Sequence, residues 1–289
     1  MDNIFKGLGI ALVTPFDKDA KVDYKALGKL VEQQLKEGAD FLCILATTAE
    51  TPCLSVEEKN SIRQFIVEKV GGRVPLLMGC GGNCTSAVVN ELITGDFTGI
   101  DGILSVCPYY NKPSQEGLFQ HFRAIAASTP LPVVLYNVPG RTGVNMEAET
   151  TLRLARECDN IVAVKEASGR LDQIAAICKG VPEGFDVLSG DDGITADIIS
   201  LGGKGVISVI GNALTAQFSE LVHLALDGNV SEARKLQESL SSMCSLLFRD
   251  GNPAGIKALL SVQGRVQNYL RLPLVPATEE TREMIAAAL

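Results

Sequence analysis

Eight short runs of apolar and β-branched residues, spaced at intervals of roughly 20 to 35 residues, constrain the fold of this chain more than any other feature. Segments with helical periodicity separate the runs. The runs begin at Gly9 (GIALVTP), Phe41 (FLCIL), Pro75 (PLLMG), Gly102 (GILSVCP), Pro132 (PVVLYN), Ile161 (IVAVKEA), Phe185 (FDVLSG) and Gly205 (GVISVIGN). Because strands that alternate with helices form parallel sheets, eight repeats without a flexible linker predict an α/β fold, a (β/α)8 TIM barrel, rather than a doubly wound sheet.

Helix signals occur between the runs and after the last one. Residues 23–37 have apolar side chains at helical spacing, and Ser55 opens the capping box S-V-E-E. Three further helix-like segments, 216–228, 231–248 and 253–266, follow the eighth run. We therefore expect a barrel that carries the catalytic site over residues 1–225 and a C-terminal helical extension over residues 226–289, to which we assign no chemistry.

Composition excludes several classes of function. The chain has 289 residues and a net charge of −8, which argues against nucleic acid and anionic membrane surfaces as partners. No apolar run approaches the roughly 18 residues of a membrane helix. The N-terminus carries Asp2 where a secretory signal would carry positive charge. These features predict a cytoplasmic protein with no nucleic-acid or membrane partner.

Cysteine and histidine offer little chemistry. The eight cysteines are scattered, and a chain of this length needs no disulfides, so we expect reduced, mostly buried thiols. Only Cys80 and Cys84 lie close together, without a nearby histidine to complete a zinc site. The two histidines, His121 and His223, fall in helix-like segments and predict packing or surface roles. Proton transfer is left to tyrosine, lysine or carboxylates.

Ionisable side chains gather at the ends of the predicted strands, where TIM barrels carry their active sites. The sixth run ends in Lys165, although a charged amine is costly to bury. For a single lysine, a solvated strand end is the simpler explanation. Alternation places Ile161, Ala163 and Lys165 on one face. If this face points into the barrel, Lys165 meets the desolvated surroundings that a Schiff-base lysine requires.

Two residues of the fifth strand and its loop complement this lysine. Tyr136 lies at the end of the run VVLYN, just before Asn137, and its phenol can donate and accept the protons that imine formation requires. Arg141 follows in NVPGRTG, and a guanidinium is suited to bidentate capture of a carboxylate. Taken alone, Tyr136 could equally be a structural tyrosine, and Arg141 could be a solvated loop arginine.

Seven motifs occur in the order in which they are found in one enzyme family. They are ALVTPF near the start, TTAET after the second strand, CPYYNKPSQEGLFQHF after the fourth, LYNVPGRTG after the fifth, VKEASG at the sixth, LSGDD at the seventh and GVISV at the eighth. Over nearly its whole length the chain resembles the pyruvate-dependent class I aldolases and lyases related to dihydrodipicolinate synthase and N-acetylneuraminate lyase. The YNxPxRTG pattern favours the synthase branch.

The resemblance implies a role for each matching residue. Lys165 matches the lysine that condenses with pyruvate, Tyr136 the proton donor and acceptor beside it, and Thr47 and Tyr110 the rest of a proton relay. In the family this second tyrosine comes from a neighbouring subunit.

The substrate-binding residues follow in the same way. Thr48 matches the residue that holds the pyruvate carboxylate, Ile207 matches a backbone contact to pyruvate, and Arg141 matches the arginine that binds the carboxylate of the second substrate.

The implied reaction joins pyruvate, held as an enamine on Lys165, to L-aspartate 4-semialdehyde and gives 4-hydroxy-tetrahydrodipicolinate for diaminopimelate and lysine biosynthesis. It needs neither a metal nor an organic cofactor, because the iminium serves as the electron sink. The resemblance also implies a homotetramer built as a dimer of dimers. Two alternatives remain open: another Schiff-base pyruvate aldolase or lyase of the sugar-acid or neuraminate type, and a non-catalytic sensor of carbonyl ligands.

The chain departs from the family pattern at two places. Ala46 and Ala49 stand where the family usually has glycine around the two threonines, and we expect activity to survive because alanine is the smallest replacement. The second departure concerns feedback by lysine, which some family members bind at a subunit interface. Ala87 replaces a glutamate there, and Val56 and Lys59 replace histidines. We expect weak or absent lysine feedback, because an anion is lost and a cation is gained.

Overall fold

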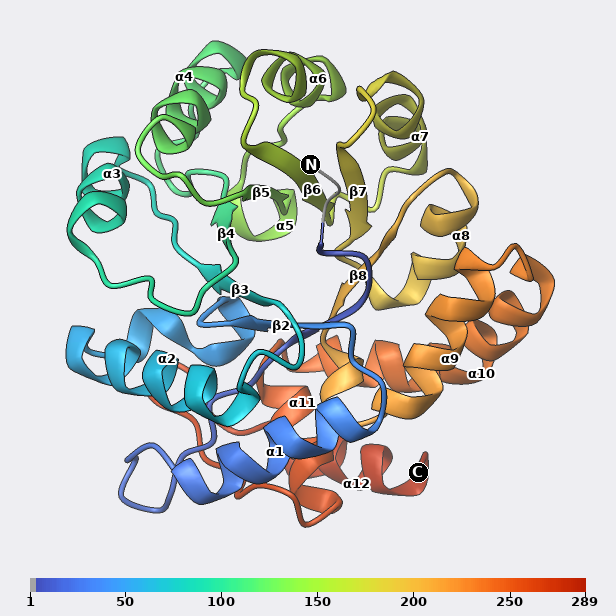
Figure 1. The fold of residues 1–289 in the computed structure, drawn as a ribbon. Helices are drawn as coiled ribbons and strands as arrows, with labels where there is room; N and C mark the ends of the chain where they lie inside the picture. The colour runs from blue at the N-terminus through green and yellow to red at the C-terminus, as the bar shows by residue number, and fades with distance from the viewer. Residues whose placement is uncertain (1–3) are drawn as a thin grey trace.

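The structure, a computed structural model, describes residues 4–289 and contains a closed barrel of eight parallel strands (Figure 1). The strands are β1 (Gly7–Ala11), β2 (Phe41–Ile44), β3 (Leu76–Gly79), β4 (Gly102–Val106), β5 (Val133–Asn137), β6 (Ile161–Glu166), β7 (Asp186–Ser189) and β8 (Gly205–Ser208). Each strand pairs with the next along the chain, and β8 pairs with β1. The predicted TIM barrel is confirmed, and all eight runs form its strands.

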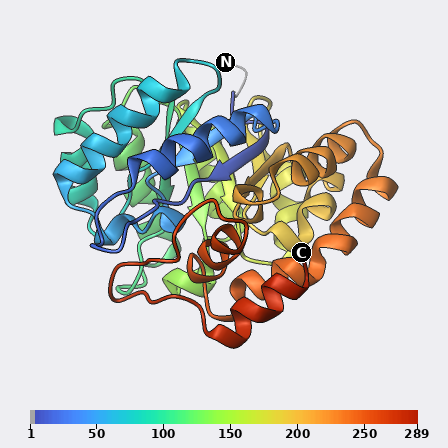
Figure 2. The ribbon, with the colours of Figure 1, turned by 90° about the horizontal axis from the view of Figure 1, so that it is seen from below.

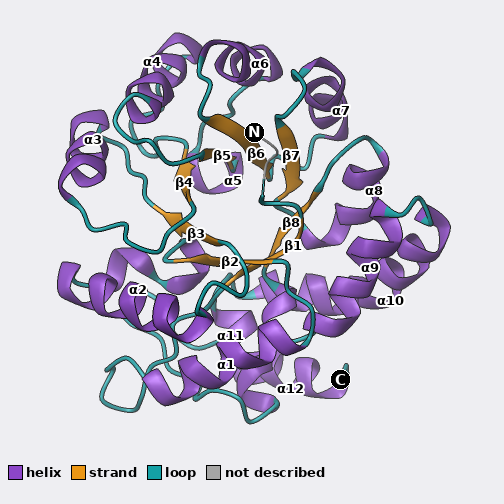
Figure 3. Cartoon of the chain, in the orientation of Figure 1, coloured by secondary structure: helices purple, strands orange, loops and turns teal. Residues whose placement is uncertain are grey.

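Helices surround the barrel (Figure 3). They are α1 (Tyr24–Lys36), α2 (Val56–Val70), α3 (Thr85–Thr94), α4 (Gln115–Ala126), α5 (Pro139–Thr142), α6 (Ala148–Glu157), α7 (Leu171–Gly180), α8 (Thr195–Ser200), α9 (Thr215–Leu226), α10 (Val230–Arg249), α11 (Ala254–Val262) and α12 (Glu279–Ala287). Short 3-10 turns also occur, of which Thr47–Ala49 and Thr51–Cys53 follow β2. The capping box predicted at Ser55 is present, since Ser55 and Glu58 bond each other's backbone N–H groups at the start of α2.

Two apolar clusters account for the uninterrupted apolar strands, because both faces of the barrel wall are buried. The inner cluster fills the barrel and includes Phe5, Phe41, Leu104, Ala163 and Ile207. The outer cluster lies between strands and helices and also takes in apolar residues of α10, α11 and α12. The boundary that we expect between residues 225 and 226 stays a prediction.

Strand β6 departs from simple alternation at its start. Val133 of β5 pairs with Ile161, but the next residue, Val134, pairs with Ala163, so Val162 is an extra residue in the register. Ile161 therefore packs in the outer cluster, while Ala163 lies in the inner one. The prediction that Ile161 shares a face with Ala163 was wrong, because a bulge adds one residue to the strand and shifts which side chains point inward.

The C-terminal residues return to the end of the barrel at which the strands terminate. Figure 2 shows them in red at the same end as the green helix α5, which follows β5. Nothing in residues 4–289 forms a helix that is long and apolar enough to cross a membrane. Within that same range, no group of three or more His, Cys, Asp or Glu side chains is placed to hold a metal ion.

Candidate active site

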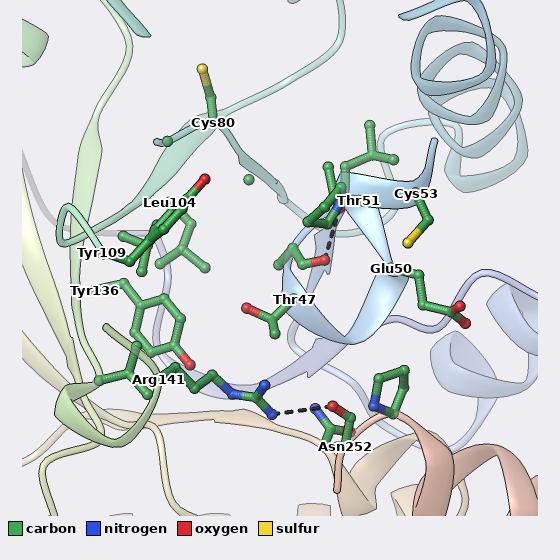
Figure 4. A pocket seen from close by; sticks show the side chains of 18 of the residues that line it. Thr47, Glu50, Thr51, Cys53, Cys80, Leu104, Tyr109, Tyr136, Arg141 and Asn252 are labelled. Carbon is green, nitrogen blue, oxygen red and sulfur yellow. Dashed lines mark hydrogen bonds between the residues drawn. The ribbon is translucent and has the colours of Figure 1, made fainter. Parts of the chain in front are cut away.

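Two adjoining cavities, of about 490 and 200 Å³, lie at the ends of the barrel strands. Residues of β5 and residues that follow β2, β5 and α10 line both of them: Ala46, Thr47, Tyr136, Val138, Arg141 and Asn252. Figure 4 shows this shared region, with Thr47 and Tyr136 pointing into the cavity from opposite walls. The position agrees with the rule that TIM barrels build their sites at the C-terminal ends of the strands.

Lys165 lies at the floor of the smaller cavity. Its side chain is 5% exposed, which excludes the solvated strand end as an explanation for this lysine. Lys165 pairs with Tyr136 across β5 and β6, and its Nζ lies 4.5 Å from the centre of the Tyr136 ring. The predicted proximity of these two side chains is confirmed, and the amine lies over the face of the Tyr136 ring.

The two threonines after β2 lie on the 3-10 turn Thr47–Ala49. Thr47 borders both cavities, whereas Thr48 is 3% exposed and borders the smaller one. The Thr48 Oγ1 accepts a hydrogen bond of 3.0 Å from Asn252 Nδ2. Because a hydroxyl can accept one bond and donate another, Thr48 keeps its own proton available for a ligand carboxylate.

Arg141 projects from α5 to the cavity wall. Its Nη2 donates to the backbone oxygen of Asn252 at 3.2 Å, the bond drawn in Figure 4. The guanidinium forms no ion pair with any acidic side chain among residues 4–289. It therefore retains donors for an anionic ligand, as the sequence predicts.

Neither Ile207 nor Tyr110, two of the predicted site residues, is among the residues that line the two cavities of the single chain. Ile207 is buried in the inner cluster, on β8. Tyr110 is 90% exposed, with a φ of 72°, so one chain alone does not bring it to Lys165. A relay that includes Tyr110 requires a second subunit and stays a prediction.

Cys53 and Cys80 line the larger cavity, and two other cysteines, Cys43 and Cys107, are buried. Burial raises the pKa of Cys43, which lies inside the barrel, to about 11. Burial also raises the pKa of Cys107, close to Asn137. Neither of these two thiols forms a thiolate readily at neutral pH.

A polar network lies outside the barrel directly behind the site. Asn137 and Glu166, the residues after Tyr136 and Lys165, pair across β5 and β6, and Asn137 Nδ2 donates to the Glu166 carboxylate. Gln173 Nε2 on α7 also donates to it, at 2.9 Å. Burial raises the pKa of Glu166, whose hydrogen bonds oppose the shift. The network joins the ends of the two strands that carry Lys165 and Tyr136.

Comparison with known proteins agrees with this geometry. The model of the dihydrodipicolinate synthetase family matches residues 4–289. The chain belongs to this family. A 4-hydroxy-tetrahydrodipicolinate synthase from Parabacteroides distasonis is 58% identical over 98% of this chain and 96% of its own.

Solved structures of this family have the same fold. The dihydrodipicolinate synthase from Thermotoga maritima superimposes with a TM-score of 0.96 at 39% identity, covering 99% of this chain and 98% of its own. The chloride-inhibited dihydrodipicolinate synthase from Acinetobacter baumannii, complexed with pyruvate, has a TM-score of 0.95 at 37% identity, with the same coverage.

The alanines that depart from the family pattern cause no backbone strain. Ala46 has a φ of −103°, and neither it nor Ala49 adopts a positive φ. The left-handed residues are instead Leu45 and Glu50, on either side of them. The threonine turn therefore accommodates both methyl groups.

Asn252, which no sequence pattern singles out, lines both cavities and contacts Thr48 and Arg141. It follows α10, in the C-terminal extension, which we expected to bring no chemistry. The stretch Asp250-Gly251-Asn252-Pro253 marks a turn, but no local signal says that this turn reaches the cavity.

Proposed function

We propose that this member of the family condenses pyruvate with L-aspartate 4-semialdehyde to give 4-hydroxy-tetrahydrodipicolinate, the first committed step of diaminopimelate and lysine biosynthesis. The relative at 58% identity carries the name of this synthase, and a related enzyme was crystallised with pyruvate. The observation that carries the proposal is the buried Lys165 amine against the Tyr136 ring, in a cavity that the Arg141 guanidinium also lines.

The chemistry begins with attack of the Lys165 amine on the pyruvate ketone. Loss of water gives an imine, and loss of a methyl proton gives an enamine whose carbon attacks the aldehyde. The amino group of the second substrate then displaces the lysine amine and closes the ring. Over the whole reaction one water is released and the enzyme is regenerated.

Each predicted residue has one task in this sequence of steps. Tyr136 and Thr47, which face each other across the cavity, carry protons to and from the carbinolamine. The Thr48 hydroxyl and the backbone at Ile207 hold pyruvate, and Arg141 binds the carboxylate of the aldehyde substrate. Tyr110 of a second subunit completes the relay, within a homotetramer that works in the cytoplasm.

The test is to trap the imine with borohydride. Reduction in the presence of pyruvate, followed by peptide mass mapping, is expected to place a covalent adduct on Lys165, and Lys165→Met is expected to give none. Turnover is then compared with pyruvate plus aspartate semialdehyde, with N-acetylneuraminate and with deoxygluconate. Faster turnover of a sugar acid identifies a different aldolase, and an adduct without turnover of any aldehyde identifies a sensor.

A further inference from the structure

The turn that carries the two threonines is bounded by residues in an unfavourable backbone conformation. Leu45 has a φ of 50°, and Glu50 has a φ of 56° and a ψ of 34°. Left-handed conformations are disfavoured for residues that have a Cβ. Contacts elsewhere in the chain must therefore hold this turn in its observed shape.

Glu50 supplies such a contact, although it follows Thr47 by only three residues. Glu50 is among the residues that line the larger cavity, but its carboxylate is fully buried and points away from Thr47 in Figure 4. Glu50 Oε1 accepts from Lys257 Nζ on α11 at 2.5 Å, and Glu50 Oε2 accepts from the backbone N–H of Arg271 at 2.9 Å. Both carboxylate oxygens are thus bound by the C-terminal extension.

Several contacts also fix the Lys257 side chain beside Glu50. Its side chain is fully buried, and its Nζ also donates to the Tyr269 backbone oxygen at 2.9 Å. The same amine lies 4.2 Å from the centre of the Phe16 ring, on the loop after β1. A buried ion pair contributes little net stability relative to an apolar pair, but it requires one geometry. The Glu50–Lys257 pair is therefore better explained as fixing the position of the threonine turn than as stabilising the fold.

A second hydrogen bond connects the C-terminal extension to the threonine turn, at Thr48. Asn252 Nδ2 donates to Thr48 Oγ1 at 3.0 Å, in a buried contact. The turn is therefore held from the extension at Thr48 and again at Glu50. A shift of this turn moves the Thr47 and Thr48 hydroxyls relative to Lys165, which a separate strand carries.

We propose that Glu50 and Lys257 are positioning residues of the reaction: their buried ion pair sets the place of the Thr48 hydroxyl that receives the pyruvate carboxylate. The inference rests on the proposed function. Neither side chain touches substrate; both act through the threonine turn.

The test is a double-mutant cycle with Thr48. Lys257→Met alone leaves a buried unpaired carboxylate, so the working variant is the neutral pair Glu50→Gln/Lys257→Met. This variant is expected to keep a thermal unfolding midpoint near that of the wild type. Its KM for pyruvate is expected to rise about tenfold, and borohydride trapping is expected to slow by a similar factor. The KM for the aldehyde is expected to stay unchanged. In a Thr48→Val background the same pair of substitutions is expected to have less than about a twofold effect, since no hydroxyl remains to be misplaced.

The matched control is Arg234→Met, which removes the surface ion pair with Asp197 and is expected to leave both KM values unchanged. Wild-type kinetics in the neutral variant overturn the inference, as does an equal penalty in the Thr48→Val background. Either result leaves the proposed function intact if the wild type forms the Lys165 adduct. A wild type that forms no adduct with pyruvate overturns the proposed function and this inference with it.

Discussion

Tyr136 and Lys165 lie directly across from each other in the pairing of β5 with β6, with the amine 4.5 Å from the ring centre. Their backbones share one ladder, so the distance between the two side chains depends on strand pairing and not on a mobile loop. The next pair in the ladder, Asn137 and Glu166, is bonded on the outer face of the barrel. Contacts on both the inner and the outer face of the barrel therefore hold the ends of β5 and β6 together.

Removing the phenol oxygen tests the proposed role of Tyr136. Tyr136→Phe keeps the ring beneath Lys165 but cannot transfer a proton, so kcat/KM for pyruvate is expected to fall by about 100- to 10,000-fold. The measurement is the initial rate of condensation, with circular dichroism to show that the variant is folded. A loss smaller than tenfold assigns the proton transfer to another group.

A variant with the family's usual glycines at positions 46 and 49 tests whether the two alanines affect activity. Because neither alanine adopts a positive φ, Ala46→Gly/Ala49→Gly is expected to change kcat/KM by less than about twofold. It is expected to lower the free energy of unfolding by about 1–2 kcal/mol, since glycine gives the unfolded chain more freedom. Urea unfolding and steady-state rates measure the two quantities. A large gain in activity contradicts the view that the turn accommodates both methyl groups.

L-lysine is expected to inhibit the condensation weakly or not at all. Lys59 adds a cation at the wall of the larger cavity, and the exposed Ala87 offers no carboxylate to an ammonium group. The matched variant Val56→His/Lys59→His/Ala87→Glu is expected to become sensitive to lysine. Half-inhibition of the wild type at a low lysine concentration refutes the expectation.

His121 makes the stability of the fold depend on pH. Burial lowers its pKa from 6.5 to about 4, and its Nδ1 lies 2.9 Å from Thr85 Oγ1. Between these two values the unfolded chain binds the proton more readily, so the free energy of unfolding falls as the pH is lowered from 6.5 to 4, by at most about 3 kcal/mol.

His121→Gln cannot take up this proton. The stability difference between the wild type and this variant is therefore expected to shrink in acid, as measured by urea unfolding at pH 7 and pH 4.5. A difference that stays the same at both values contradicts a neutral, buried His121.

Local patterns predict most of the fold but only part of the site. Eight apolar runs were enough for the strands, and Lys165 and Tyr136 were recognisable because each ends a run. The bulge at Val162 was not recognisable from the sequence, because it depends on the register of β6 with β5. Asn252 and Lys257 were missed because their partners, Thr48 and Glu50, lie 204 and 207 residues away in the sequence, and such contacts leave no periodic signal.

These long-range contacts bear on when the protein acquires its activity during synthesis. A ribosome makes Lys165 and Tyr136 well before it reaches Asn252 and Lys257, the partners of Thr48 and Glu50. A nascent chain with every barrel strand already made still lacks both anchors of its threonine turn. The threonine turn that shares the cavity with the Lys165 amine therefore gains its two anchors only after every barrel strand has been synthesised.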